Sequence, residues 1–221
     1  MCAEITSTTE EYLETIYRLE QKEGAARTGE IAANLGVVLG TVTNTIEHLE
    51  GEGLVSHVPY RGVKLTSRGL KGALNVIRRH RLSERLLTDM IRVGWADVHT
   101  PACRLEHGLT DEIIKPLEKA LKHPKTCPHG NPIPTKCGGI IEEKSEPLTA
   151  LNEREEGTVV KITEEKADLL RYLDTMGLVP GASINVIEKA PFDGPITLRV
   201  GEAKRVLSRS MASIIQVKRT T

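Results

Sequence analysis

The chain has 221 residues, of which 39% are hydrophobic and 27% are charged, and its acidic and basic side chains balance. This composition is typical of a globular protein with one large domain or two to three small ones. No run of about 18 apolar residues is present, which excludes a predicted membrane-spanning helix. A net charge of zero neither favours nor excludes nucleic-acid binding, so only local basic patches could indicate that function.

The four cysteines are too few for a disulfide scaffold in a chain of this length. The N-terminus is polar, so we expect no secretory signal. Together these features predict a cytoplasmic protein whose cysteines are free thiols.

Three short helices are predicted within the first 50 residues. A capping box of Thr8 and Glu11 predicts the start of the first helix. Apolar positions at helical spacing predict two more, over residues 28–35 and 40–50, joined by a tight turn at Gly36. This is the helix-turn-helix pattern, and a predicted β-hairpin follows it as a wing.

In a winged helix-turn-helix, the outward face of the second helix enters the major groove of DNA. That face lacks an arginine for bidentate base contacts, so we expect modest base readout and a larger contribution from DNA shape. A winged domain that contacts proteins is the alternative. The residues predicted to bind DNA, from this face and the wing, are Thr41, Thr43, Asn44, His48, Arg61 and Lys64.

A long helix is predicted over residues 67–91, and two ionisable residues lie inside its apolar stripe. His80 and Glu84 are one turn apart on the same face. An unpaired buried charge is costly, so the two must either pair or bind a cation.

A second cluster follows on a helix predicted from Thr100 to Asp111. Cys103, Glu106 and His107 are at positions i, i+3 and i+4, and His99 lies between the two clusters. Thiolate, carboxylate and imidazole together indicate a first-row transition-metal site rather than a calcium or magnesium site. Either cluster alone could be an ion pair or a solvated surface, whereas the two in succession favour metal.

Several segments also resemble a known family: "TTEEYLETIYRLE", "RRHRLSERLLTDMI", "VHTPACRLEHGLTDE" and "GNPIP". The chain resembles the diphtheria-toxin-repressor family of metal-dependent transcriptional regulators over its whole length, least closely after Gly139. The resemblance implies two metal sites in this sequence. The ancillary site would contain His80, Glu84 and His99, and the regulatory site would contain Cys103, Glu106 and His107.

The first helix completes the regulatory site in this family. The iron-responsive branch has a methionine where this chain has Glu11, and the manganese-responsive branch has an acid there and a second one at the position of Glu14. That second branch, however, has a glutamate in place of Cys103. We expect Fe²⁺ rather than Mn²⁺ because thiolate favours softer ions, and Zn²⁺, Co²⁺ or Ni²⁺ should substitute in vitro. Alternatively, Glu11 only closes the capping box.

The proline- and glycine-rich stretch "HPKTCPHGNPIPTKCGG" has no period and is predicted to be a loop. Cys127, His129 and Cys137 in it could form a zinc clip, but the spacing is unusual and a fourth ligand is missing, so we favour a plain loop. Residues 140–149 read as a charged linker.

Short strands and one helix near residues 166–174 predict a small C-terminal β-barrel, which resembles the SH3-like domain of the same family. That domain lends two polar ligands to the ancillary site, and the nearest counterparts here are Glu165 and Asp168. The expected fold is mainly α with a small β part. Its segments are a winged helix-turn-helix DNA-binding domain over residues 1–74, a metal-binding and dimerisation domain over 75–126, a linker over 127–154 and an SH3-like domain over 155–221.

The resulting hypothesis is a homodimeric repressor that binds a palindromic double-stranded operator when Fe²⁺ or Mn²⁺ is bound, and that controls metal-homeostasis genes. A metal-dependent hydrolase is one rival, but the sequence shows no separate general base. A regulator that senses an organic ligand is another.

Overall fold

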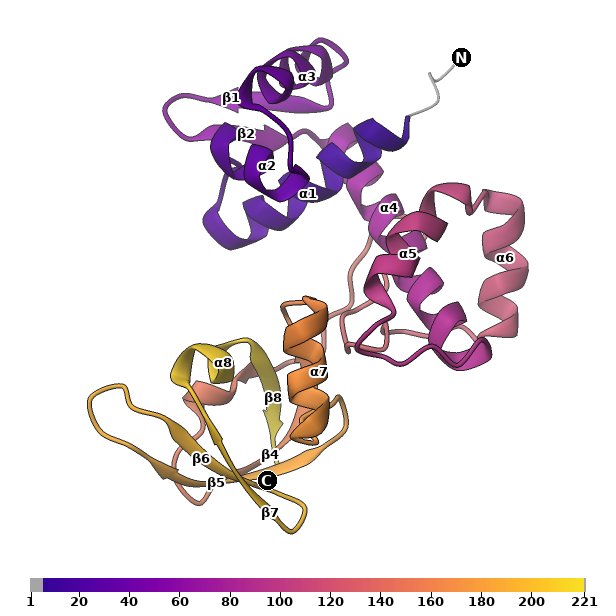
Figure 1. Cartoon of the computed structure of the whole chain (residues 1–221). Helices are drawn as coiled ribbons and strands as arrows, with labels where there is room; N and C mark the ends of the chain where they lie inside the picture. Colours follow the sequence, from indigo (N-terminus) through magenta and orange to yellow (C-terminus); the bar gives the residue numbers. More distant parts are fainter. Residues whose placement is uncertain (1–5, 221) are drawn as a thin grey trace. The chain divides into compact units, whose positions relative to one another are not determined.

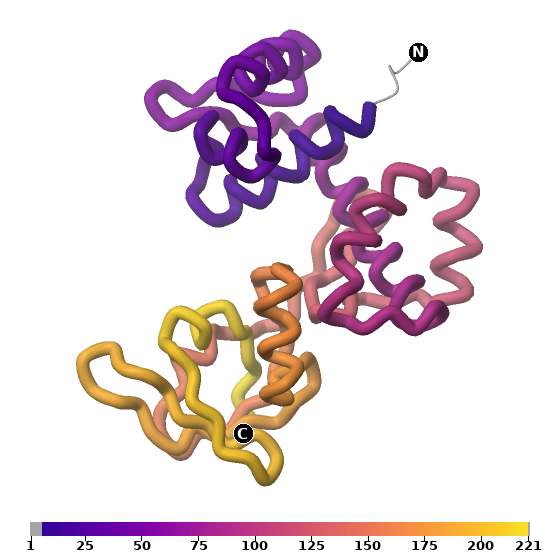
Figure 2. The backbone as a smooth tube through the Cα atoms, viewed as in Figure 1, coloured from indigo at the N-terminus to yellow at the C-terminus, as the bar shows by residue number. Residues whose placement is uncertain are grey.

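The computed structural model describes residues 6–220, and the course of its backbone can be followed in Figures 1 and 2. The chain divides into two compact units. The first contains the described residues up to Arg79 together with Pro134–Gly139, and the second contains His80–Ile133 and the chain from Ile140 onward. Within residues 6–220 no helix is both long and apolar enough to cross a lipid bilayer.

The first unit is a winged helix-turn-helix, as predicted. Its apolar core joins residues from the helices and both strands, including Leu13, Ile31, Leu49 and Val63. The hairpin is antiparallel and pairs Val55 with Leu65. The elements are α1 (Ser7–Glu23), α2 (Thr28–Leu35), α3 (Leu39–Gly51), β1 (Val55–Val58), β2 (Gly62–Leu65) and the first part of α4 (Ser67–Arg85).

The predicted start of α1 is wrong. Thr6, rather than Thr8, is the N-cap residue, and its side-chain oxygen accepts a hydrogen bond of 3.2 Å from the backbone amide of Thr9. Thr6 has extended backbone angles, as an N-cap residue requires, whereas Thr8 is already helical.

The helical part of the second unit departs from the prediction at two helix ends. The α-helix of α4 ends at Arg85 and continues as a π turn over Leu86–Met90, and α5 (His99–Leu105) continues as a 3₁₀ turn over Glu106–Gly108. Side-chain periodicity does not distinguish such turns from α-helix. Helix α6 (Asp111–Ala120) packs through Ile114 and Leu117 against Leu82 of α4.

The C-terminal part of the second unit is a six-stranded antiparallel sheet with the order β3-β8-β4-β5-β6-β7. Its core consists largely of Val, Leu and Ile, and Leu170 and Leu173 of α7 belong to it. The linker prediction for residues 140–149 is partly wrong, because Glu146–Pro147 pairs with β8 and Leu148 is fully buried. The elements are β3 (Glu146–Pro147), a 3₁₀ turn (Leu148–Ala150), β4 (Glu156–Ile162), α7 (Ala167–Thr175), β5 (Ser183–Lys189), β6 (Ile196–Val200), β7 (Ala203–Leu207), α8 (Arg209–Ser213) and β8 (Ile215–Arg219).

A loop after α6 connects the helical part of this unit to the sheet. On one side, Arg85 of α4 donates a hydrogen bond of 2.8 Å to the carbonyl of Thr126. On the other side, the amide of Ile162 in β4 donates to the carbonyl of His129 at 2.9 Å. Gly130 lies so close to this strand that a Cβ atom there would be 2.0 Å from the carbonyl oxygen of Val160.

Replacing Gly130 by alanine is expected to destabilise the second unit. Gly130 has φ +85°, so a side chain would add strain of about 1–3 kcal/mol, and the clash with β4 would add more. Gly181→Ala is the matched control, because Gly181 has φ +92° but nothing within 4 Å of its Cβ position. Thermal and urea unfolding followed by circular dichroism should show the larger loss for Gly130→Ala, and equal losses would contradict the packing argument.

Candidate metal centre

Helix α4 places the first two predicted ligands in the interior of the second unit. His80 is 1% exposed and Glu84 is 0% exposed. Because they are four residues apart on one helix face, His80 Nε2 and Glu84 Oε1 approach to 3.2 Å.

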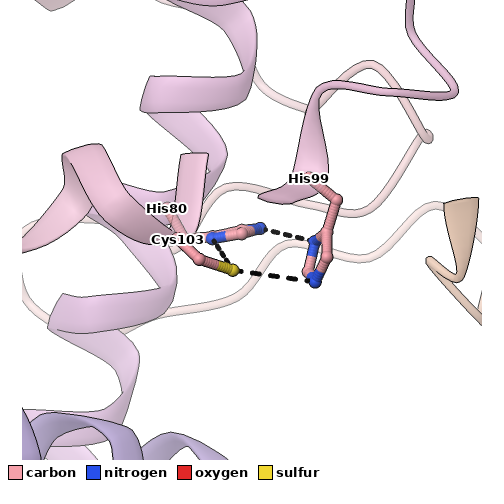
Figure 3. Close-up of side chains that lie close together, drawn as sticks. All are labelled: His80, His99 and Cys103. Atoms are coloured by element: carbon pink, nitrogen blue, oxygen red, sulfur yellow. Dashed lines mark hydrogen bonds between the residues drawn. The ribbon is translucent and has the colours of Figure 1, made fainter. Parts of the chain in front are cut away.

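His99 and Cys103, one turn apart on α5, face His80 (Figure 3). The rings of His80 and His99 meet edge to face with centroids 4.8 Å apart. The sulfur of Cys103 lies 3.9 Å from His80 Nδ1 and 3.7 Å from His99 Nε2. Cys103, which the spacing on this helix predicted to be a metal ligand, therefore lies beside the two histidines of the predicted ancillary site, His80 and His99.

Glu106 connects this cluster to the predicted regulatory site. It is 2% exposed, and its Oε2 accepts a hydrogen bond of 2.5 Å from His80 Nδ1. Its other oxygen, Oε1, is 3.5 Å from His107 Nε2. The imidazole of His80 thus has Glu84 beside one nitrogen and Glu106 beside the other.

The C-terminal part of the unit contributes one of its two predicted ligands, from the segment between β4 and α7. Glu165, just before α7, places Oε2 3.5 Å from His99 Nδ1. The amide of Asn131 donates to Glu165 Oε1 at 2.8 Å and orients the carboxylate. Asp168 is not brought to the cluster, since its side chain is 99% exposed and pairs with Arg171 at 2.8 Å.

Cys127 and His129, which the loop pattern gave no reason to prefer as ligands, are also buried here. His129 Nδ1 is 3.2 Å from Glu84 Oε1, and the sulfur of Cys127 is 3.9 Å from the same nitrogen. The other nitrogen of His129 donates to the carbonyl of Trp95 at 2.7 Å, which turns Nδ1 toward the carboxylates. Cys137 is exposed and does not join them.

Three overlapping groups in the described part of the chain have ligand atoms within 4.8 Å of one another. Each offers a mixture of imidazole nitrogen with thiol or carboxylate, which fits a divalent transition metal. Glu84 Oε2 also fits a cation ligand, because it is buried and has no hydrogen-bond partner among the described residues. The groups are His80, His99 and Cys103; His80, Glu84, His99 and Glu165; and Glu84, Cys127, His129 and Glu165.

Burial and hydrogen bonds act in opposite directions on the pKa values of His99 and His129. Burial lowers the pKa of His99, but bonds to Cys103 and Glu84 outweigh it and raise that pKa to about 9. The pKa of His129 rises to about 12 in the same way. Burial opposes ionisation of Glu84, yet its three imidazole partners hold its pKa well below the usual value for glutamate.

The half-buried thiol of Cys103 and the buried thiol of Cys127 differ in acidity. Burial raises the pKa of Cys127. Burial acts in the same direction on Cys103, but the hydrogen bonds to His80 and His99 lower its pKa below the usual thiol value. A thiolate is the form that binds metal, so Cys103 is the more readily ionised sulfur ligand.

The remaining predicted residues lie in the first unit. Glu11 and Glu14 are on α1, where Glu14 accepts a hydrogen bond of 2.8 Å from Arg18. On α3 and in the wing, Lys64 is half-buried and the other predicted DNA-binding residues are exposed: Thr41, Thr43, Asn44, His48 and Arg61.

Three family models match the chain in order. They are the N-terminal DNA-binding domain of iron-dependent repressors at residues 4–63, the metal-binding and dimerisation domain of the same repressors at residues 66–135, and the FeoA domain at residues 146–219.

Individual relatives agree with these matches. The iron-dependent repressor IdeR of Mycobacterium tuberculosis is 34% identical over 98% of this chain and 99% of its own length. The diphtheria toxin repressor of Corynebacterium diphtheriae is 42% identical over 59% of this chain and 58% of its own length.

Solved structures show the same likeness. A manganese-dependent transcriptional repressor in complex with manganese has a TM-score of 0.86 and 29% identity, over 96% of this chain and 100% of its own. IdeR of T. acidophilum has a TM-score of 0.81 and 29% identity, over 96% and 97% of the two chains.

The fold and the comparisons define a metal-dependent transcriptional repressor with a DNA-binding, a dimerisation and an SH3-like domain, rather than an enzyme. The chain belongs to the diphtheria-toxin-repressor family. Operator DNA and a second copy of the chain are therefore its partners.

Binding of a divalent ion to this cluster is expected to release protons near neutral pH. The raised pKa values of His99 and His129 keep both imidazoles protonated in the metal-free protein, and a ligand nitrogen must lose its proton. Metal affinity should therefore fall as the pH is lowered. Calorimetric titration with Mn²⁺ in buffers of different ionisation enthalpy measures this release, and His99→Gln should release less. Metal binding with no dependence on the buffer would refute the prediction.

Proposed function

We propose that the chain is an Fe²⁺-activated repressor of metal-homeostasis genes that binds a palindromic operator as a homodimer. The observation that supports iron over manganese is the Cys103 sulfur, which lies beside two imidazoles and has a lowered pKa. Thiolate and imidazole favour Fe²⁺ over the harder Mn²⁺. This function requires access to DNA, so we expect the protein in the cytoplasm.

The regulatory ligands are Cys103, Glu106 and His107 from the second unit, with Glu11 and Glu14 of α1 from the first. A divalent ion held by these residues would supply positive charge to their carboxylates. Without that charge the carboxylates lose their counter-ion, and we expect operator binding to weaken. The additional acids on α1 support Mn²⁺ as the alternative activating ion, as does the manganese-bound structure of a relative.

The DNA-binding role belongs to α3 and the wing. The exposed face of α3 offers hydroxyl and amide groups to the major groove, and Arg61 in the wing offers charge to a phosphate. A palindromic operator matches the twofold symmetry of a homodimer, with two recognition helices in adjacent major grooves.

An anaerobic DNA-binding titration tests the choice of metal. A fluorescent duplex, selected from a random library by the protein itself, is titrated with protein in the presence of Fe²⁺, Mn²⁺ or Zn²⁺ at buffered free concentrations. Fe²⁺ should activate binding at a lower free concentration than Mn²⁺. The reverse order would identify a manganese regulator, and equal binding with a chelator would refute metal control.

Replacing Cys103 by serine should weaken metal-activated DNA binding, because it removes the soft ligand. We expect the Fe²⁺ concentration for half-maximal binding to rise at least about tenfold. Cys137→Ser is the matched control, since that thiol is exposed and lies outside the cluster. A regulator that senses an organic ligand instead predicts that both variants bind DNA normally.

Metal and operator should strengthen each other equally. If the ion increases operator affinity by a given factor, the operator must increase metal affinity by the same factor. Metal-binding isotherms with and without the selected duplex measure this factor. Identical isotherms would show that metal binding and DNA binding are not coupled.

A further inference from the structure

We propose that Tyr60, at the tip of the wing, contacts the minor groove of the operator beside the major groove that receives α3. The inference rests on the proposed function and adds a contact residue to it. In this contact the aromatic ring packs against a deoxyribose, and the phenolic hydroxyl donates a hydrogen bond to a phosphate oxygen. Tyrosine suits both tasks, because its side chain combines an apolar body with a polar end.

Tyr60 presents its whole side chain to solvent. Its relative exposure is 108%, and it lies in the loop between β1 and β2, which projects from the first unit (Figure 1). At this exposure the ring adds nothing to the apolar core of the unit. An exposed aromatic ring is unfavourable in water, and contact with a partner would recover that free energy.

The backbone at Tyr60 has a conformation that a tyrosine rarely adopts, with φ +62°. The amide of Arg61 donates a hydrogen bond of 3.0 Å to the carbonyl of Val58, which closes a turn with Pro59 second and Tyr60 third. This is the pattern of a type II turn, whose third residue is normally glycine or asparagine. A residue that strains the turn and does not stabilise the core indicates a functional role.

Two sets of contacts hold the wing tip in a fixed position relative to α3. Glu50 of α3 accepts hydrogen bonds from the backbone amide of His57 at 3.0 Å and from its ring Nδ1 at 2.7 Å. On the other strand, Val63 and Ala26 exchange two backbone hydrogen bonds of 2.9 Å. Gly62 packs so closely there that a Cβ atom would be 2.1 Å from the Ala26 carbonyl oxygen. The tip is therefore preorganised, and binding costs it little conformational entropy.

The neighbours of Tyr60 favour DNA as its partner. Arg61 is exposed, and Lys64 is half-buried on β2, so the ring lies beside positive charge. One ring and one guanidinium are too small for a protein interface, but they match a sugar–phosphate edge. A domain that inserts a helix into the major groove can reach the adjacent minor groove with a neighbouring segment, as the N-terminal arm of a homeodomain does.

Operator binding by three variants tests the proposal. Full-length protein saturated with Mn²⁺ is titrated into the selected fluorescent duplex. Tyr60→Gly removes the side chain and relieves the turn, so it should bind about tenfold more weakly without unfolding more readily. Tyr60→Phe removes only the hydroxyl and should bind about threefold more weakly. Phe192→Gly is the matched control and should bind like the parent, because Phe192 is 100% exposed and has φ +57° but lies in the second unit.

Two further measurements separate a minor-groove contact from a loss of charge. Because tyrosine is neutral, Tyr60→Gly should leave the salt dependence of the affinity unchanged, whereas Arg61→Ala should reduce its slope by about one. Hydroxyl radicals from X-ray radiolysis attack the deoxyribose in the minor groove. Footprinting with these radicals should show that Tyr60→Gly loses protection at one group of sugars in each half-site and keeps the rest.

The proposal is overturned if Tyr60→Gly binds the duplex as tightly as the parent, or if it protects every sugar that the parent protects. Equal losses of affinity for Tyr60→Gly and Phe192→Gly would also overturn it. The proposed function fails separately. A parent that binds the duplex equally well with a chelator would sink only the proposed metal activation, since the comparison of variants at Tyr60 would still stand.

Discussion

The second unit depends on one buried carboxylate. Glu84 has no exposure to solvent, and three imidazoles lie within 3.6 Å of its Oε1. A buried anion is costly unless it is paired, so the elements that supply the imidazole partners of Oε1 must stay together. Those elements are the long helix α4, helix α5 and the loop that contacts strand β4. The carboxylate is thus a structural link between the helical part of the unit and its sheet.

The same constraint explains why the metal sites do not separate cleanly. His80 uses one ring nitrogen toward Glu84 and the other toward Glu106, so ancillary and regulatory ligands meet on a single imidazole. A metal ion bound to Nε2 requires a neutral ring, and the Nδ1 proton then points at Glu106. A rearrangement at the ancillary or the regulatory site would therefore change the position of the His80 ring and so alter the other site. No change of fold is needed for this coupling.

The sequence predicted a ligand reliably only where the spacing of residues along a single helix was enough to bring the ligands together. His80 and Glu84 could be found because an α-helix fixes the geometry of residues four apart. Cys127 and His129 were considered only as part of a zinc clip with Cys137 and were set aside in favour of a plain loop. Their actual partners come from α4 and from the segment after β4, and sequence spacing within the loop cannot predict a contact with such distant segments. Glu165 and Asp168 were equivalent in the sequence, and only the start of α7 at Ala167 decides that Asp168 faces solvent. The predicted ligands on α1 remain predictions.

The chain contains one tryptophan, and its position has a practical consequence. The indole nitrogen of Trp95 donates to Asp174 of α7 at 2.8 Å, and its ring lies 5.5 Å from that of His129. Its emission therefore originates at the junction of the helices with the sheet, beside a candidate ligand. The intrinsic fluorescence of Trp95 can therefore report structural changes at this junction in the unmodified protein, without a dye or an engineered label.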